Sequence, residues 1–121
     1  MGNFTSIAGA ARRQVAQLNL GANATVSSWY DLTWDQPCVH SIPNYARDVE
    51  FSPDGRSFVI VTSGAQHERT KLCDTAVKYD TADVSGDAVP AWVNFTPQDT
   101  LLSVAITGNG VYVGGHQKAW T

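Results

Sequence analysis

The sequence predicts an all-β chain made of repeated hairpins, and three observations support this prediction. Ten glycines and four each of tryptophan, tyrosine and phenylalanine in 121 residues favour strands and tight turns over helices. The stretch VEFSPDG (49–55) alternates apolar and polar residues into an Asp-Gly turn, which indicates a hairpin. A similar stretch, VAITGNG (104–110), follows 55 residues later and ends in Asn-Gly.

A second pair of segments extends the repeat. Residues 12–19 (RRQVAQLN) align with 73–80 (CDTAVKYD), and each is followed by a polar turn and then a tryptophan, Trp29 or Trp92. The unit is a hairpin, a short link and a second hairpin, roughly 55–60 residues long. Short, evenly spaced strands at this period are typical of a β-propeller or a β-repeat array. We predict a two-repeat fragment of a β-propeller with four-stranded antiparallel blades.

The repeat also organises the chain into segments. GNF at 2–4 takes the place that GHQ takes at 115–117, so the chain holds about two units cut at the same phase. Two units do not close a ring, because propellers have at least about four blades. We expect a piece of a longer protein, with assembly of several copies as the alternative. The segments are the end of a first blade (1–29), an irregular loop (30–46), a second blade (47–95) and the opening hairpin of a third blade (102–121).

The first element could be a helix or a strand by composition, because residues 8–21 have the alanine content of a helix. The apolar residues there do not follow a decisive helical spacing, and the aligned segment 73–80 is β-branched and aromatic. We therefore predict a strand over 13–19.

The remaining elements follow from prolines and from apolar alternation. Residues 30–46 contain two prolines and no period, which indicates a long loop. The hairpin 47–62 should pair with strands near 74–80 and 88–95, and the hairpin 102–114 should open a second sheet packed face to face on the first. The predicted core residues on these strands are Val49, Phe51, Val59, Val61, Val104, Ile106 and Val113.

Charge and hydropathy exclude two classes of partner. The net charge is −3, only 16% of residues are charged, and the basic residues are scattered, so no basic face for nucleic acid is present. No apolar run approaches the length of a membrane span. Three lysines in the chain favour an exported protein. Nothing in the sequence implies a cofactor.

Three carboxylates in one turn, Asp80, Asp83 and Asp87, raise the question of calcium, which binds several oxygen ligands on a flexible loop. Their spacing matches no EF-hand or glycine-rich nonapeptide, and the matching turn of the first unit (19–25) has no carboxylate. A solvated hairpin turn is the simpler interpretation. No metal site is predicted, and calcium at this turn stays open.

Histidine provides one candidate binding residue. His40, His67 and His116 lack the spacing of metal ligands. His116 follows Gly114-Gly115 at a strand end near the expected rim of a blade, so it is either a binding residue or an ordinary loop histidine.

Tryptophan provides another candidate. Trp29 and Trp92 take the same position in the repeat, which predicts that they pack one blade on the next. Trp34 lies in the irregular loop instead and is the better candidate for an exposed ligand contact, for example by stacking on a sugar ring. No Gly-x-Ser-x-Gly elbow and no Cys-His nucleophile pattern occurs, so no catalytic residue is assigned.

The N-terminal stretch GNFTSIAGAARRQVAQLN resembles the bacterial propeller repeats of the delta-60 kind, in which Gly-Gly is followed by Phe, small residues, Gly, Arg and a strand of the type Leu-Ala-x-Leu-Asn. The rest of the chain is similar to a group of large secreted actinobacterial proteins of unassigned activity. This resemblance covers nearly the whole chain and carries no catalytic residue set, and the chain is much shorter than the propellers of that family. The matching residues are Gly2, Phe4, Ile7, Gly9, Arg13, Val15, Ala16 and Leu18.

The resemblance bears on the two cysteines, Cys38 and Cys73. In an oxidising compartment they form one bridge, whereas in cytosol they are two buried thiols. Because the family is exported, we predict a disulfide that fastens the loop 30–46 to the strand near 74. We expect an extracellular or cell-surface protein whose leader lies outside this chain.

Two functions from different classes follow. The first is a non-catalytic extracellular scaffold or binding module, whose partners are neighbouring blades and a carbohydrate or cell-surface protein. The alternative is part of a propeller enzyme, a polysaccharide lyase or hydrolase, with catalytic residues outside this chain. The fold alone does not decide between them, because propellers serve both.

Overall fold

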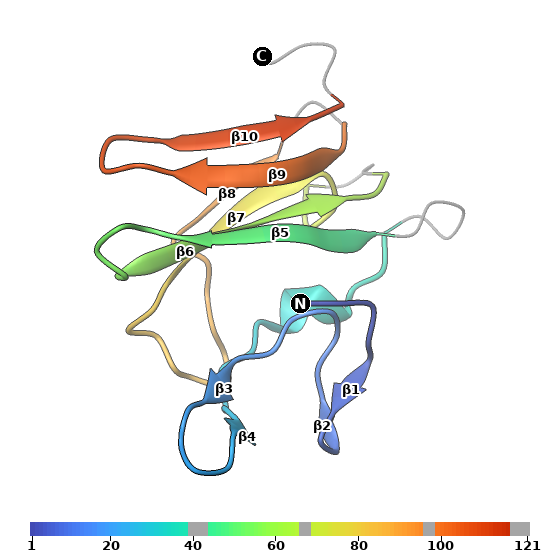
Figure 1. The fold of residues 1–121 in the computed structure, drawn as a ribbon. Coiled ribbons are helices and arrows are strands. Elements are labelled where there is room, and N and C mark those ends of the chain that lie inside the picture. The colour runs from blue at the N-terminus through green and yellow to red at the C-terminus, as the bar shows by residue number, and fades with distance from the viewer. Residues whose placement is uncertain (39–43, 66–68, 96–98, 117–121) are drawn as a thin grey trace.

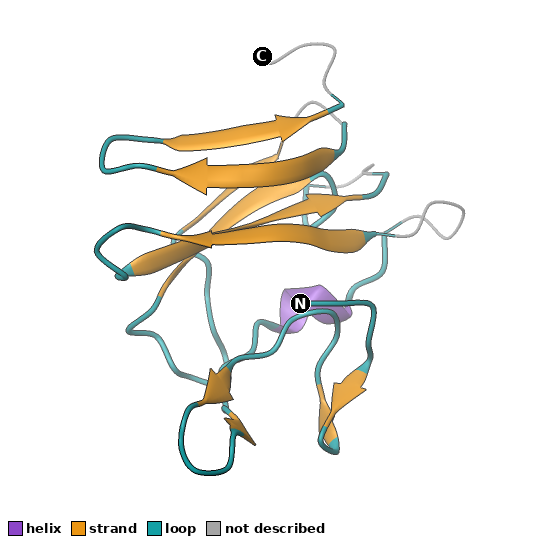
Figure 2. Cartoon of the chain, in the orientation of Figure 1, coloured by secondary structure: helices purple, strands orange, loops and turns teal. Residues whose placement is uncertain are grey.

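The computed structural model describes residues 1–38, 44–65, 69–95 and 99–116, which form an antiparallel all-β fold (Figure 1). Figure 2 shows that strands and loops make up the described chain apart from one short 3-10 helix, η1 (Leu32–Asp35). Four two-residue strands come first: β1 (Ser6–Ile7), β2 (Ala10–Ala11), β3 (Leu18–Asn19) and β4 (Thr25–Val26). Longer strands follow: β5 (Tyr45–Phe51), β6 (Ser57–Ser63), β7 (Thr75–Asp80), β8 (Trp92–Phe95), β9 (Leu101–Ile106) and β10 (Val111–Gly115). The all-β prediction is confirmed.

The central sheet has four strands in the order β5-β6-β7-β8, with every neighbouring pair antiparallel. The predicted hairpin 47–62 and its pairing with strands near 74–80 and 88–95 are confirmed. Every residue of β6 is buried, because β6 lies inside the sheet and both of its faces are covered.

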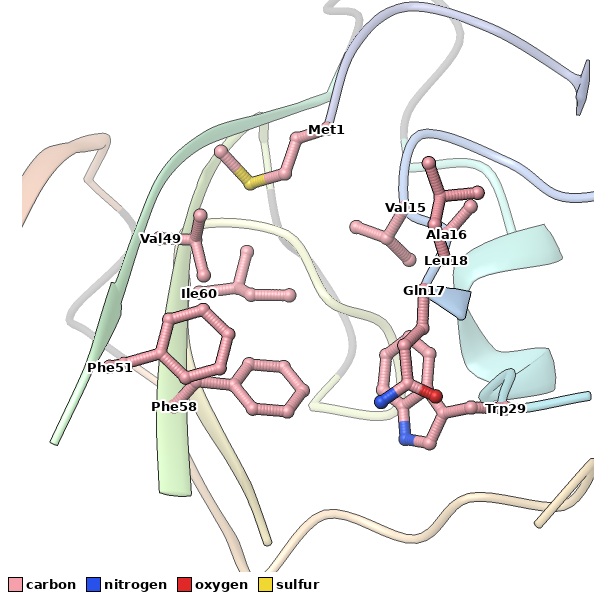
Figure 3. A pocket seen from close by; sticks show the side chains of 10 residues that line it. All are labelled: Met1, Val15, Ala16, Gln17, Leu18, Trp29, Val49, Phe51, Phe58 and Ile60. Carbon is pink, nitrogen blue, oxygen red and sulfur yellow. The ribbon is translucent and has the colours of Figure 1, made fainter. Parts of the chain in front are cut away.

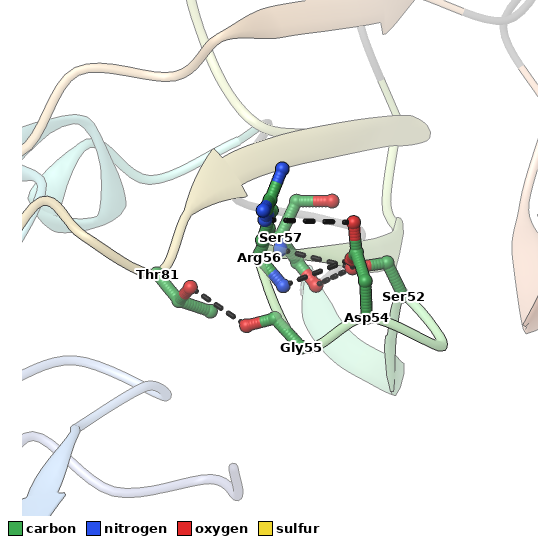
Figure 4. Close-up of polar contacts among 6 residues, drawn as sticks. All are labelled: Ser52, Asp54, Gly55, Arg56, Ser57 and Thr81. Atoms are coloured by element: carbon green, nitrogen blue, oxygen red, sulfur yellow. Dashed lines mark hydrogen bonds and ion pairs between the residues drawn. The ribbon is translucent and has the colours of Figure 1, made fainter.

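The turn between β5 and β6 is held by its own side chains (Figure 4). Asp54 Oδ1 accepts hydrogen bonds from the Ser52 hydroxyl at 2.7 Å and from the Arg56 backbone N–H at 3.0 Å. These bonds hold the pKa of Asp54 below its usual range. Gly55 has a φ of 69°, which glycine adopts without a Cβ penalty. The Asp-Gly signal in the sequence therefore forms the predicted tight turn, and Thr81 donates to the Gly55 carbonyl at 2.7 Å.

The hairpin β9–β10 forms a separate two-stranded sheet stacked on β5 and β6 (Figure 1). Asp48 of β5 joins the two layers, because its Oδ2 accepts a hydrogen bond from the Val104 N–H at 3.0 Å. The buried side chains between the layers are Val59, Val61, Ala76, Leu101 and Val104, with Ile106 and Val113 packed against them. The predicted face-to-face packing of two antiparallel sheets is confirmed.

The N-terminal region covers the opposite face of the central sheet. Trp29 packs edge-on against Phe58 and Tyr79, with ring centroids 5.6 and 5.2 Å apart. The central sheet is thus the middle of three layers. The buried side chains of this second cluster are Val15, Trp29, Tyr30, Trp34, Phe58, Ile60, Leu72, Val77, Tyr79 and Ala88.

Three expectations about the elements need correction. The strand predicted over 13–19 exists only at Leu18–Asn19, because Gln14 has a φ of 64° and interrupts the extended backbone. The loop 30–46 contains η1 and the start of β5. Phe51, predicted in the core, is 54% exposed, since it ends the edge strand β5 where little covers its ring.

Trp29 and Trp92 do not occupy equivalent positions. The Gln17 carbonyl accepts from the Ser27 N–H, and the aligned Lys78 carbonyl accepts from the Ala91 N–H. In the strand ladders Lys78 pairs with Trp92, whereas Leu18 pairs with Val26, which places Gln17 opposite Ser27, two residues before Trp29. Trp29 is 2% exposed and packs on the central sheet, whereas Trp92 is 36% exposed, so the predicted packing is observed for Trp29.

No sheet closes into a ring within the described residues. The sheets there are the central one and three two-stranded ones, β1-β2, β3-β4 and β9-β10. The propeller arrangement and its division into blades therefore remain proposals.

Candidate binding surfaces

Trp34 was predicted to be exposed, and this is wrong. The side chain is 1% exposed, and its indole N–H donates to the Tyr79 hydroxyl at 3.1 Å. The Tyr79 hydroxyl in turn donates to Asp31 Oδ2 at 2.7 Å, and burial raises the pKa of Tyr79. Asp31 Oδ1 caps η1 by accepting from the Thr33 N–H at 2.7 Å. The capping Asp is the sequence signal that predicts this turn and directs Trp34 inward.

His116, the other candidate, is at the surface. Its side chain is 82% exposed, and Nδ1 lies 3.5 Å from Asp99 Oδ1. Its backbone N–H donates to the Thr100 carbonyl at 2.9 Å, which fixes the end of β10. A binding role for His116 stays a prediction. His40, His67 and Trp120 lie outside the described residues.

The predicted disulfide is present, because Cys38 and Cys73 are bonded with their Cα atoms 6.1 Å apart. Both residues are buried, and the bond fastens the segment after η1 to the chain just before β7. Gly64 packs tightly beside this bond. Its φ is 139°, and a Cβ there would lie 2.9 Å from the Asn44 Cβ and 3.4 Å from Cys38 Sγ. A side chain would clash at this strand end.

Asp74 follows the disulfide and is 2% exposed, with a φ of 50°. Its Oδ1 accepts from the Thr100 hydroxyl at 3.4 Å. Desolvation raises the pKa of Asp74 to about 6, and the nearby Asp99 carboxylate adds to the shift. Asp74, Asp99 and His116 lie at one end of the sheets, where Nδ1 of His116 is 3.5 Å from Asp99 Oδ1. Because Asp74 is buried, a dissolved substrate does not reach it.

Asp74 resembles Gln14, which lies one residue after the position that the alignment of 12–19 with 73–80 matches to Asp74. Gln14 is also 2% exposed and left-handed. Its amide donates to the Asn44 carbonyl at 3.0 Å and accepts from the Ala46 N–H at 2.6 Å, at the start of β5. Asp74 contacts Thr100, at the start of β9. Each of the two hairpins is thus fastened to the preceding part of the chain by a buried polar side chain on a left-handed backbone.

The two hairpins share a bulge as well. The register of β5 with β6 shifts between Ala46 and Asp48, which leaves Arg47 unpaired in the ladder. The register of β9 with β10 shifts so that Leu102, 55 residues later, is unpaired. A bulge is a specific local backbone feature, so the hairpins are counterparts in structure as well as in sequence. The bulges had no recognisable signal in the residue types.

A pocket of about 270 Å³ lies between the N-terminal region and the β5–β6 hairpin (Figure 3). Val49, Phe51, Phe58 and Ile60 form one wall. The volume is below the roughly 300–1,000 Å³ of pockets for drug-sized ligands, and it suits a single side chain. The facing residues are Met1, Val15, Ala16, Gln17, Leu18 and Trp29.

A second hollow, of about 380 Å³, lies between the turns of the hairpins β5–β6 and β9–β10, and Asp80 lines it. Asp83 accepts a hydrogen bond from the Ser85 N–H at 3.0 Å, which holds the pKa of Asp83 below its usual range. In the part of the chain that the structure describes, no three His, Cys, Asp or Glu residues are grouped as a metal ion would require. Asp80, Asp83 and Asp87 do not form such a group.

No protein-family model, no curated protein and no solved structure matches this chain. Over the described ranges, no helix has the length and apolar character needed to span a membrane.

Proposed function

We propose that this chain is a non-catalytic scaffold or binding module of the β-propeller kind that works outside the cell or at its surface. The observation that carries the proposal is the repeated junction. Gln14 and Asp74, both buried and left-handed, contact the chain at the starts of successive hairpins, and Arg47 and Leu102 mark the same bulge in both. A stack of like units, each packed on its neighbours, is built by such repetition.

The surface residues support a binding role. Tyr112 on β10 is 62% exposed and Trp92 on β8 is 36% exposed. Exposed aromatic rings offer apolar area with a polar edge, which suits both protein interfaces and stacking on sugars. The partners that fit are neighbouring blades and a carbohydrate or cell-surface protein.

The disulfide supports the proposed location. A bond between Cys38 and Cys73 persists in an oxidising compartment and is rare in reducing cytosol.

Binding and turnover measured on the same samples test the proposal. The protein is incubated with bacterial cell-wall polysaccharides and with a glycan array, and bound protein and newly released reducing ends are both quantified. We expect binding without release, weakened at least fivefold by His116→Ala and unchanged in Leu20→Ala, since Leu20 is an apolar residue 94% exposed in the β3–β4 turn. Release of reducing ends would favour the enzyme alternative, and absence of binding to glycans and to extracted surface proteins would contradict the proposal.

A further inference from the structure

Two complementary half-units lie at opposite ends of the described chain. The central sheet contains a hairpin, β5–β6, followed by a second strand pair, β7–β8. Among the described residues, the hairpin β9–β10 has no second strand pair beside it in its sheet. The pair β3–β4 likewise has no hairpin beside it in its sheet. Gln17, just before β3, and Lys78 in β7 are counterparts, because each carbonyl accepts from the returning strand.

We propose that β10 of one copy of this chain pairs with residues 15–18 of a second copy. The hairpin β9–β10 and the pair β3–β4 then form one four-stranded sheet with the order and polarity of β5-β6-β7-β8. This inference rests on the proposed function, since it assumes that the units stack alike, and it names the partner of the exposed hairpin as the chain itself.

The register follows from the pairing of β6 with β7. Next to the turn, Phe51 pairs with Phe58 in one hairpin, and Ile106 pairs with Val111 in the other. Val111 is therefore the counterpart of Phe58, and the residue after it, Tyr112, is the counterpart of Val59. Val59 pairs with Lys78, the counterpart of Gln17. Tyr112 of one copy therefore lies opposite Gln17 of the other.

The same correspondence places the Tyr112 ring in the apolar pocket of the second copy. Val59 is fully buried in a cluster with Val104, Ile106 and Val113. Their counterparts on β5 and β6 all line the pocket (Figure 3), and they are Val49, Phe51 and Ile60. A tyrosine ring that is 62% exposed thus meets a pocket suited to one side chain, and it covers Phe51, which is 54% exposed. The Met1 side chain also lines the pocket, and it moves aside to admit the ring.

The same register brings a second pair of exposed residues together. Cross-strand partners share a face, so Trp92, paired with Lys78, lies on the same face of the central sheet as Val59. In the joint sheet, Leu18 of the second copy pairs with Val111 of the first copy. Leu18 then faces the central sheet of the first copy, on the side where Trp92 lies. Leu18 and Trp92 are 44% and 36% exposed in the single chain, and association buries both.

Disulfide trapping between two single-cysteine variants tests the register. Paired residues on antiparallel strands have Cα atoms about 4.5–5.5 Å apart, within reach of a disulfide. Tyr112→Cys and Gln17→Cys are prepared separately with the native disulfide intact, mixed, and oxidised in a glutathione buffer. We expect a cross-linked heterodimer at least tenfold more abundant than from Tyr112→Cys mixed with Leu20→Cys, because Leu20 lies three residues, about 10 Å, along the strand. No cross-link, or equal cross-linking in both mixtures, would overturn the proposal.

Sedimentation velocity over a concentration series gives a second, independent readout. Wild type is expected to associate with rising concentration, Tyr112→Asp to weaken association at least tenfold, and Val84→Asp to behave as wild type. Val84 is the matched control because it is 58% exposed in the β7–β8 connection. A wild type that stays monomeric, or equal effects of both substitutions, would show that the hairpin is covered by something other than a second copy. Such a result leaves the glycan-binding test of the proposed function untouched.

Discussion

Replacing Gln14 with alanine should detach the N-terminal layer from the central sheet. The Gln14 amide satisfies the Asn44 carbonyl and the Ala46 N–H, at 3.0 and 2.6 Å. Alanine leaves both backbone groups without this partner, and each unsatisfied buried group costs about 1–3 kcal/mol. A φ of 64° strains glutamine and alanine to a similar extent. Backbone strain therefore contributes little to the difference in stability between the wild type and the variant. We expect Gln14→Ala to lower the free energy of unfolding by about 2–6 kcal/mol.

Urea unfolding followed by tryptophan fluorescence measures this loss, because Trp29 reports on the same layer. Gln17→Ala is the matched control. Gln17 is half-buried and accepts one hydrogen bond, from the Ser27 hydroxyl at 2.6 Å, so its substitution should cost about 1 kcal/mol or less. The losses in free energy of unfolding for Gln14→Ala and Gln17→Ala are then compared. If they differ by less than about 0.5 kcal/mol, which is much less than the expected difference, Gln14 does not hold the two layers together.

Three further substitutions probe the disulfide end. Ionising Asp74 opposes folding, because its pKa is about 6 in the folded chain and its ordinary value is 3.8. Asp74→Asn should therefore add about 2–3 kcal/mol at pH 7.5 and roughly 0.5 kcal/mol at pH 4, and guanidinium unfolding that shows no such pH trend would contradict this. Replacing both Cys38 and Cys73 by alanine should cost about 4 kcal/mol from the chain entropy of a 35-residue separation, and a loss under about 1 kcal/mol would refute the estimate. Gly64→Ala should lower the thermal midpoint through strain of about 1–3 kcal/mol, whereas Gly108→Ala, with open space around it, should not.

Local signals predicted the hairpins well. The Asp-Gly and Asn-Gly turns and the apolar alternation on both sides of them depend on residues close in sequence, so β5–β6 and β9–β10 form where expected. Apolar alternation does not say which strand lies at an edge. Val59 and Phe51 carry the same signal, yet Val59 is fully buried in the middle of the sheet and Phe51 is 54% exposed at its edge.

The candidate surfaces were harder to predict, because they depend on contacts between distant segments. Gln14 is polar and sits in a segment that aligns with a strand, and only the approach of Asn44 and Ala46 explains its burial. The burial of Trp34 was missed although it depends on a local signal. Asp31 and Thr33 form a local cap that turns the indole inward, and the two prolines of the loop conceal this short helix. The two-residue offset between Trp29 and Trp92 depends on the strand register, which an ungapped alignment does not contain.

The central claim is that the sheet β5–β8 is packed on both faces, by the N-terminal layer and by the hairpin β9–β10. Nuclear Overhauser effects between methyl groups of the specifically labelled protein test it most directly. The account predicts cross-peaks within each buried cluster, between Val61 and Val104 on one face and between Val15 and Ile60 on the other. A hairpin whose Val104 methyls show no cross-peak to Val61, or an N-terminal layer whose Val15 shows none to Ile60, would contradict the stacked arrangement.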